Sequence, residues 1–90
     1  ISDFKSAIVA FDIFIGDYPG TEFKEDALYY KFDSAYQLAV NSISSKMEDR
    51  LKVAKTAYGN LMKYKSDTHY KVKADEMNER VEKELQNFTK

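Results

Sequence analysis

Apolar residues recur at three- and four-residue steps along most of this chain, and few residues interrupt the pattern. The 90 residues include one proline and three glycines. An all-β chain needs many more turn-forming residues, whereas amphipathic helices need the three- and four-residue spacing that is present. The sequence therefore predicts an all-α fold.

The spacing predicts four antiparallel helices with three short connections. Tyr18-Pro19-Gly20 divides the first helix from the second, because proline disfavours helical geometry in the residue before it and glycine permits a turn. A polar run at residues 41–45 and the segment 64–67 supply the other two connections. The predicted helices cover about residues 2–17, 21–40, 46–64 and 67–88. Residues that can cap helix N-termini are Ser2 or Asp3, Thr21, and Ser66 or Asp67.

The last three predicted helices differ in the width of their apolar faces. The second has a wide face, which favours packing on two sides, and it consists of Phe23, Ala27, Leu28, Tyr29, Phe32, Ala35, Tyr36, Ala39 and Val40. The third uses Leu51, Ala54, Ala57, Tyr58, Leu61 and Met62. The fourth has a single narrow stripe, Tyr70, Ala74, Met77, Val81, Leu85 and Phe88. A narrow stripe is typical of a helix that caps the end of an array.

The two halves of the chain resemble each other when one is shifted by 47 residues. The shift aligns Thr21 with Thr68 and Ala27 with Ala74. It also aligns Lys5 with Lys52, Ala7 with Ala54, Ala10 with Ala57, Phe11 with Tyr58, Phe23 with Tyr70 and Lys24 with Lys71. Self-similarity at a fixed period is typical of stacked helical repeats.

The repeated residues resemble the tetratricopeptide family. Its second-helix pattern of alanine, aromatic, small or apolar residue and proline is matched by Ala7, Phe11, Phe14 and Pro19, and again, without the proline, by Ala54, Tyr58 and Leu61. Tyr29, Phe32 and Tyr36 lie at the steps of its first-helix pattern, and Asp33 stands where that pattern has glycine. The resemblance implies an α-solenoid fragment forming one domain, residues 1–90. It would hold the second helix of one repeat, one complete repeat and a C-terminal capping helix.

A more specific set of spaced residues covers nearly the whole chain. It consists of Phe4-x-x-Ala7-Ile8-x-x-Phe11-x-x-Phe14-Ile15-x-x-Tyr18-Pro19-Gly20-Thr21, Ala27-x-x-Tyr30, Tyr36-x-Leu38-Ala39-x-Asn41-Ser42, Lys46-x-x-x-Arg50-Leu51 and Ala54-x-x-x-Tyr58. These stretches resemble the BamD family, the outer-membrane lipoproteins of the β-barrel assembly machinery in Gram-negative bacteria.

The BamD resemblance implies a protein-binding scaffold subunit that takes part in the assembly and insertion of outer-membrane β-barrel proteins. The expected partners are other subunits of that machinery, above all the barrel-forming subunit, and nascent outer-membrane proteins. The expected location is the periplasmic face of the outer membrane, through a lipid anchor upstream of Ile1. The alternative is a generic periplasmic or cytoplasmic tetratricopeptide adaptor with unrelated protein clients.

Composition disfavours several other classes of function. The net charge is −1, with 14 basic and 15 acidic residues mixed along the chain, so no basic patch indicates nucleic acid. No apolar run approaches the roughly 20 residues of a membrane span. There is no cysteine, and the one histidine, His69, is expected on the surface. We therefore expect no enzyme activity, no catalytic residue, no metal and no cofactor.

Two sets of residues are candidates for protein binding. The first is a stripe at steps of four, three and four, Tyr30, Ser34, Gln37 and Asn41, which matches the groove-facing positions of tetratricopeptide arrays. A rigid, amphipathic tyrosine ring suits peptide binding. The alternative is that Tyr30 packs on a neighbouring helix.

The second candidate is an edge made of Asn41, Ser42, Lys46 and Arg50. Arg50 could form a bidentate bond with a carboxylate of a partner. In the structural alternative, Asn41 ends one helix and Ser45 caps the next. Arg50 would then pair locally, with Glu48 or Asp49.

The first predicted helix has no upstream helix to cover it within this chain. Its apolar face, Phe4, Ile8, Phe11 and Ile15, would then be partly exposed. An exposed apolar face favours association, so a homodimer of the chain is a further expectation.

Overall fold

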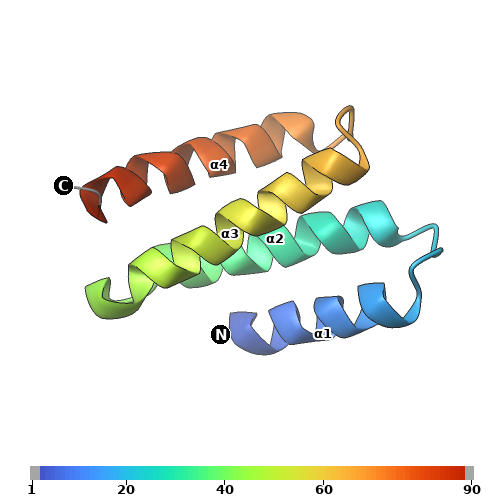
Figure 1. Cartoon of the computed structure of the whole chain (residues 1–90), viewed down its shortest axis with the longest axis horizontal. Helices are drawn as coiled ribbons and strands as arrows, with labels where there is room; N and C mark the ends of the chain where they lie inside the picture. The colour runs from blue at the N-terminus through green and yellow to red at the C-terminus, as the bar shows by residue number, and fades with distance from the viewer. Residues whose placement is uncertain (1–2, 89–90) are drawn as a thin grey trace.

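Four α-helices, each running opposite to the one before it, make up most of the structure, a computed structural model that describes residues 3–88 (Figure 1). They are α1 (Phe4–Asp17), α2 (Lys24–Val40), α3 (Ser44–Tyr64) and α4 (Lys71–Leu85), followed by a short 3₁₀ helix, η1 (Gln86–Phe88). Residues 3–88 contain no strand. The prediction of an all-α arrangement is confirmed.

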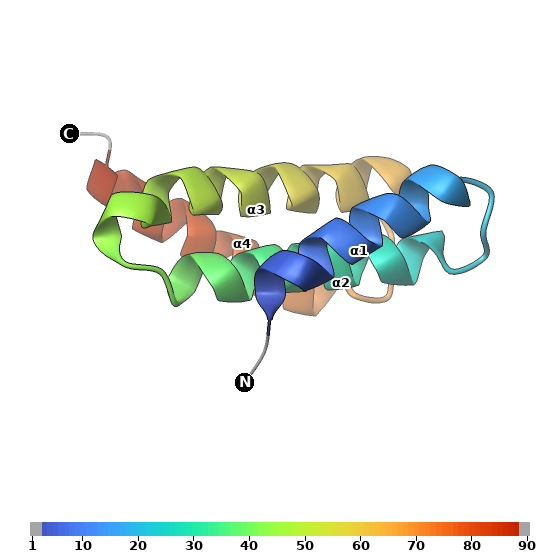
Figure 2. The ribbon, with the colours of Figure 1, turned by 90° about the horizontal axis from the view of Figure 1, so that it is seen from below.

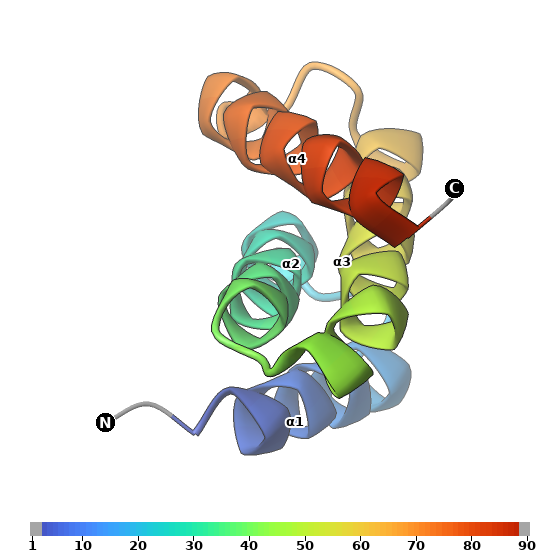
Figure 3. The same cartoon turned by 90° about the vertical axis from the view of Figure 1, so that its left-hand side faces the viewer.

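The helices form three layers. Helices α2 and α3 pack against each other in the middle, with α1 on one side of this pair and α4 on the other (Figure 3). Helix α1 crosses the pair obliquely (Figure 2). Helix α2 contacts α1, α3 and α4, which agrees with its wide apolar face. The molecule measures 41 × 27 × 21 Å.

The helix starts differ from the sequence prediction more than the helix ends do. Helix α2 begins at Lys24 rather than at 21, and α4 begins at Lys71 rather than at 67. Helix α3 begins earlier than expected, at Ser44. The expected cap Asp3 is confirmed, because its carboxylate accepts the Ser6 N–H at 3.0 Å. The alternative cap Ser2 lies outside the described residues.

The late starts of α2 and α4 have one cause, a turn that occurs twice. In the first turn, Thr21 N–H donates to Tyr18 O (3.0 Å), Phe23 N–H to Thr21 Oγ1 (3.2 Å) and Lys24 N–H to Thr21 O (3.3 Å). In the second, Thr68 N–H donates to Lys65 O (3.2 Å), Tyr70 N–H to Thr68 Oγ1 (3.3 Å) and Lys71 N–H to Thr68 O (3.0 Å). A threonine hydroxyl that accepts an N–H two residues later stabilises a turn in place of a helical start.

The threonine, rather than Pro19-Gly20, is the common element of the two turns. Ser66 and Asp67 occupy the corresponding positions in the second turn, which keeps the same hydrogen bonds. No residue in the range 3–88 has a positive φ, so Gly20 is not required for a left-handed conformation. The shift of 47 residues therefore relates two turns with the same hydrogen bonds.

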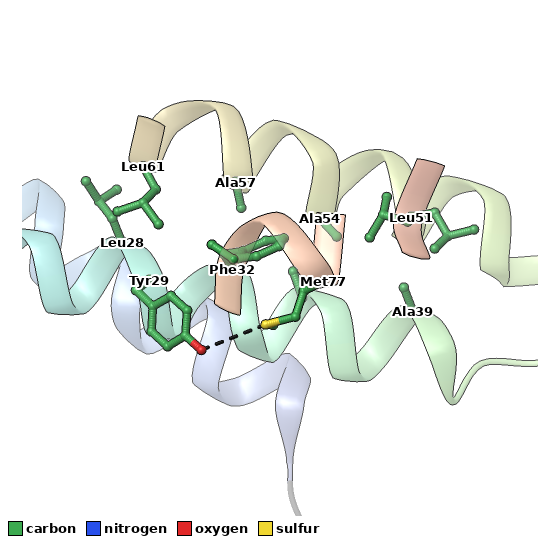
Figure 4. Packing of buried hydrophobic residues seen from close by; sticks show 12 residues of the cluster. Leu28, Tyr29, Phe32, Ala39, Leu51, Ala54, Ala57, Leu61 and Met77 are labelled. Carbon is green, nitrogen blue, oxygen red and sulfur yellow. Dashed lines mark hydrogen bonds between the residues drawn. The ribbon is translucent and has the colours of Figure 1, made fainter. Parts of the chain in front are cut away.

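The core lies between α2, α3 and α4 (Figure 4). The largest fully buried side chains are Phe32, Leu51, Leu61 and Val81. Alanines lie among them and allow close approach of the helices; they are Ala35, Ala39, Ala54, Ala57 and Ala74. The apolar faces predicted for α3 and α4 are confirmed by this core. The prediction that Phe23 belongs to the apolar face of the second helix is wrong, because Phe23 lies in the turn and is 56% exposed.

Tyrosine side chains join α4 to the rest of the molecule. The Tyr29 and Tyr70 rings stack with their centroids 4.0 Å apart, and the Tyr29 hydroxyl donates to the Met77 sulfur at 3.8 Å (Figure 4). The Tyr58 hydroxyl donates to Asp75 Oδ1 at 2.5 Å. This last bond raises the pKa of Tyr58 to about 12, with burial adding to the effect, and it lowers the pKa of Asp75.

Stability should fall as the pH rises from the ordinary tyrosine pKa of 10.0 to about 12. Across this window the unfolded chain loses the Tyr58 proton while the folded chain keeps it, so unfolding becomes more favourable; below the window the stabilisation is complete. In Tyr58→Phe, the urea midpoint followed by circular dichroism should decline less across the same window. Tyr18→Phe is the control, since Tyr18 is 61% exposed. An equal decline in Tyr58→Phe and the unmodified chain would contradict the assignment.

Candidate protein-binding surface

The stripe predicted on the second helix is not one open surface. Tyr30 is 46% exposed, but Ser34 is only 8% exposed. Gln37 is half-buried, and its Nε2 donates to Asp33 Oδ1 at 3.5 Å. Asn41 is exposed at the end of α2. The burial of Ser34 therefore separates Tyr30 from the polar end of the stripe.

The residues of the second candidate edge close the connection between α2 and α3. Asn41 Nδ2 donates to the Gln37 carbonyl at 2.8 Å, and so ends α2. The Ser42 hydroxyl donates to the Leu38 carbonyl at 2.6 Å and accepts a bond from Arg50 Nη1 at 2.7 Å. These bonds favour the structural alternative for all three side chains.

Two details of that alternative are corrected by the structure. Arg50 bonds to the Ser42 hydroxyl, whereas Glu48 pairs with Lys52. Helix α3 follows Ile43, which has an extended backbone, and no side chain caps it, so Ser45 is not the cap. Lys46, the remaining member of the edge, is exposed.

The structure places Tyr30 in a groove between α1 and α2 that the sequence did not predict. The groove has a volume of about 380 Å³. Its lining is Ala10, Phe11, Phe14, Phe23, Asp26, Ala27 and Tyr30. Six of these seven side chains are aromatic or apolar, and Asp26 is the single charged one.

Aromatic contacts hold Tyr30 at the edge of this groove. Its ring stacks with Phe11 of α1, with centroids 6.4 Å apart and planes 22° apart. It meets Tyr29 and Tyr70 edge to face, with centroid distances of 5.3 and 5.9 Å. Tyr30 thus packs on a neighbouring helix, as in the alternative interpretation, and also borders this groove; its role in protein binding stays a prediction.

A hydrogen bond from Tyr70 holds the Asp26 side chain in position. The Tyr70 hydroxyl donates to Asp26 Oδ1 at 2.5 Å. This bond is the main reason that the pKa of Tyr70 is raised, and burial adds to it. Because a raised pKa keeps the hydroxyl protonated, Tyr70 remains the donor of this bond in ordinary conditions.

A signal for this groove was available in the sequence. Residues at similar distances before and after a helix-to-helix turn come close together in an antiparallel pair. The Tyr18-Pro19-Gly20 turn accordingly brings Phe14 near Phe23. Helical spacing places Phe23 on the apolar face of the second helix, because spacing does not tell which face a neighbouring helix leaves open.

The described residues hold neither a metal-binding group nor a membrane span. Residues 3–88 contain no group of three or more His, Asp or Glu side chains that could hold a metal ion. No helix among them is both long and apolar enough to cross a bilayer. The His69 side chain is 69% exposed, as expected, with Nδ1 3.4 Å from the Glu25 carboxylate. The absence of enzyme activity stays a prediction.

Comparisons with known proteins give no family for the chain. No protein-family model, curated protein or solved structure matches it. The family resemblance therefore rests on the spaced residues of the sequence and stays a prediction.

Proposed function

We propose that this chain is the protein-binding part of a helical-repeat scaffold. The observation that carries the proposal is the groove between α1 and α2, lined by Phe11, Phe14, Phe23 and Tyr30. Tyr30 and Phe23 are 46% and 56% exposed although both are large and apolar. Rigid aromatic side chains in a concave surface are the usual anchors of protein interfaces.

Three features support a tetratricopeptide-like array. The threonine turn recurs after 47 residues with the same hydrogen bonds. Consecutive helices are antiparallel, and α2 contacts α4 as well as its neighbours in sequence. Alanines occupy the contacts between helices. Stacking of such units generates extended concave binding surfaces.

We propose further that the scaffold acts in outer-membrane β-barrel protein assembly, as a BamD-like lipoprotein on the periplasmic face of that membrane. The spaced residues of α1 to α3 and the Tyr18-Pro19-Gly20-Thr21 turn support this assignment. Its partners would be the barrel-forming subunit and nascent outer-membrane proteins, and its anchor a lipid attached upstream. The alternative function is an adaptor of the same architecture with unrelated protein clients.

Co-purification of the full-length protein tests the assignment. The barrel-forming subunit should be recovered with it from detergent-solubilised envelopes, and Tyr30→Ala should lower the recovery at least about fivefold, as loss of an interface anchor does. Val72→Ala is the matched control, because Val72 is 77% exposed on α4, away from the groove. Recovery of other proteins alone would favour the adaptor. A full-length protein without a lipoprotein signal and lipidated cysteine would exclude the BamD-like assignment.

Self-association is the remaining proposal about partners. Helix α1 has no buried residue, and Val9 and Ile13 on it are 56% and 58% exposed. An apolar helix surface of this kind can pair with a second copy of the chain. Light scattering distinguishes the two states, and a strict monomer at high concentration would count against a homodimer.

A further inference from the structure

The α1–α2 groove combines aromatic walls with a single negative charge. Two alanines, Ala10 of α1 and Ala27 of α2, leave room between the helices. Phe11, Phe14 and Tyr30 are among the aromatic residues around that room. A space of about 380 Å³ accommodates one long side chain and part of the backbone that carries it.

No basic residue among residues 3–88 lines this groove. Its lining contains neither lysine nor arginine. The two lysines of α2 are engaged on other sides of the helix: Lys24 Nζ lies 4.9 Å from the centroid of the Tyr64 ring of α3, and Lys31 pairs with Asp12 at 2.5 Å. The Asp26 carboxylate therefore lines an apolar space, and no lysine or arginine in the range 3–88 forms an ion pair with it.

One oxygen of this carboxylate is held by the fold. The Tyr70 hydroxyl from the second threonine turn donates to Asp26 Oδ1, and Tyr70 in turn stacks on Tyr29 at 4.0 Å. The bond to Oδ1 thus orients the carboxylate before any ligand arrives. Preorganised acceptors bind cationic groups at a lower entropic cost.

We propose that the α1–α2 groove binds an arginine side chain of a partner polypeptide, with the guanidinium stacked on the groove's aromatic rings and paired with Asp26. The charge complementarity selects a basic side chain over an acidic or neutral one. The aromatic walls select arginine over lysine, because a planar guanidinium stacks on aromatic faces and is more weakly hydrated than an ammonium. This inference deepens the proposed function by naming the chemistry of the partner.

Nuclear magnetic resonance titration of the chain with a short blocked peptide containing one arginine tests the proposal. The amide signals of Ala10, Phe11, Asp26 and Ala27 should shift. A peptide with citrulline, the neutral counterpart of arginine, should bind at least about tenfold more weakly, since the charge-assisted bond is lost. A lysine peptide should bind with intermediate affinity.

Two variants and one control test whether the arginine peptide binds in the groove. Asp26→Asn keeps an oxygen acceptor for Tyr70 and should reduce arginine-peptide affinity about tenfold while leaving citrulline-peptide affinity unchanged. Asp75→Asn is the matched control, because Asp75 also accepts a tyrosine hydroxyl, that of Tyr58, but lies outside the groove. Ala10→Phe changes an exposed residue and should block the groove without unfolding the chain.

The proposal is overturned if arginine and citrulline peptides bind equally, or if Asp75→Asn weakens binding as much as Asp26→Asn. It is also overturned if the arginine peptide shifts no groove signal. Recovery of a protein partner through Tyr30 together with any of these results would leave the scaffold function intact and remove only the arginine assignment. If no partner were recovered while the arginine peptide bound normally, the scaffold function would be removed and the arginine assignment would stand.

Discussion

Replacing Phe32 with alanine is expected to remove a large part of the chain's stability. Phe32 is fully buried, and its ring lies 5.6 Å from that of Tyr58 on α3 and 6.4 Å from that of Tyr36. Truncating a buried phenylalanine costs about 3–5 kcal/mol. Small domains have a free energy of unfolding of only about 5–15 kcal/mol. Urea denaturation followed by far-ultraviolet circular dichroism measures the loss.

Two further substitutions test whether the loss of stability comes from the loss of buried volume or from removing a phenylalanine at any position. Phe23→Ala removes the same side chain from a position that is 56% exposed, and should change the free energy of unfolding by about 0.5 kcal/mol or less. Phe32→Leu retains most of the buried volume and should cost less than Phe32→Ala. Similar losses at Phe23 and Phe32 would mean that the core does not lie where the structure places it.

Replacing Thr68 with valine should have the second largest effect. Thr68 is 3% exposed, and its hydroxyl has two partners: it donates to the Glu25 carboxylate on α2 and accepts the Tyr70 N–H at 3.3 Å. Valine keeps the shape and removes both bonds. Hydrogen bonds to charged groups contribute about 1.5–3 kcal/mol, so a loss of this order is expected in urea denaturation.

The first threonine turn provides the matched control. Thr21 occupies the same position, but within the described range 3–88 its hydroxyl accepts only the Phe23 N–H, at 3.2 Å, and bonds to no carboxylate of another helix. Thr21→Val should therefore cost about 1 kcal/mol or less, as for an ordinary neutral hydrogen bond. Equal costs at Thr21 and Thr68 would show that the bond to Glu25 contributes nothing measurable.

Helical spacing predicted the parts of the fold that depend on apolar periodicity. The stripe that includes Ala74, Met77 and Val81 is buried as expected, and so is the face of α3 that includes Leu51 and Leu61. Local hydrogen bonds set the helix starts, which apolar spacing does not predict. The hydroxyls of Thr21 and Thr68 delay the starts of α2 and α4, and such bonds compete with the helix in a way that apolar patterns do not record.

The candidate site was less predictable, because it depends on which faces neighbouring helices cover. The sequence predicts Tyr30 and Ser34 on one partner-facing stripe, whereas Tyr30 borders the α1–α2 groove and Ser34 is buried. The polar character of Arg50 suggested a partner contact, whereas a serine eight residues earlier, Ser42, accepts its bond. Charge and polarity mark residues that need a partner without saying whether it belongs to the same chain.

The absence of buried side chains on α1 gives the molecule two levels of cooperativity. Helices α2, α3 and α4 share the buried cluster, whereas α1 contributes only partly covered residues such as Ile8 and Ile15 to its edge. Local opening requires little free energy where few side chains are buried. Local opening of α1 should therefore cost less free energy than opening of α2, α3 or α4, and the bond that positions Asp26 would persist through it.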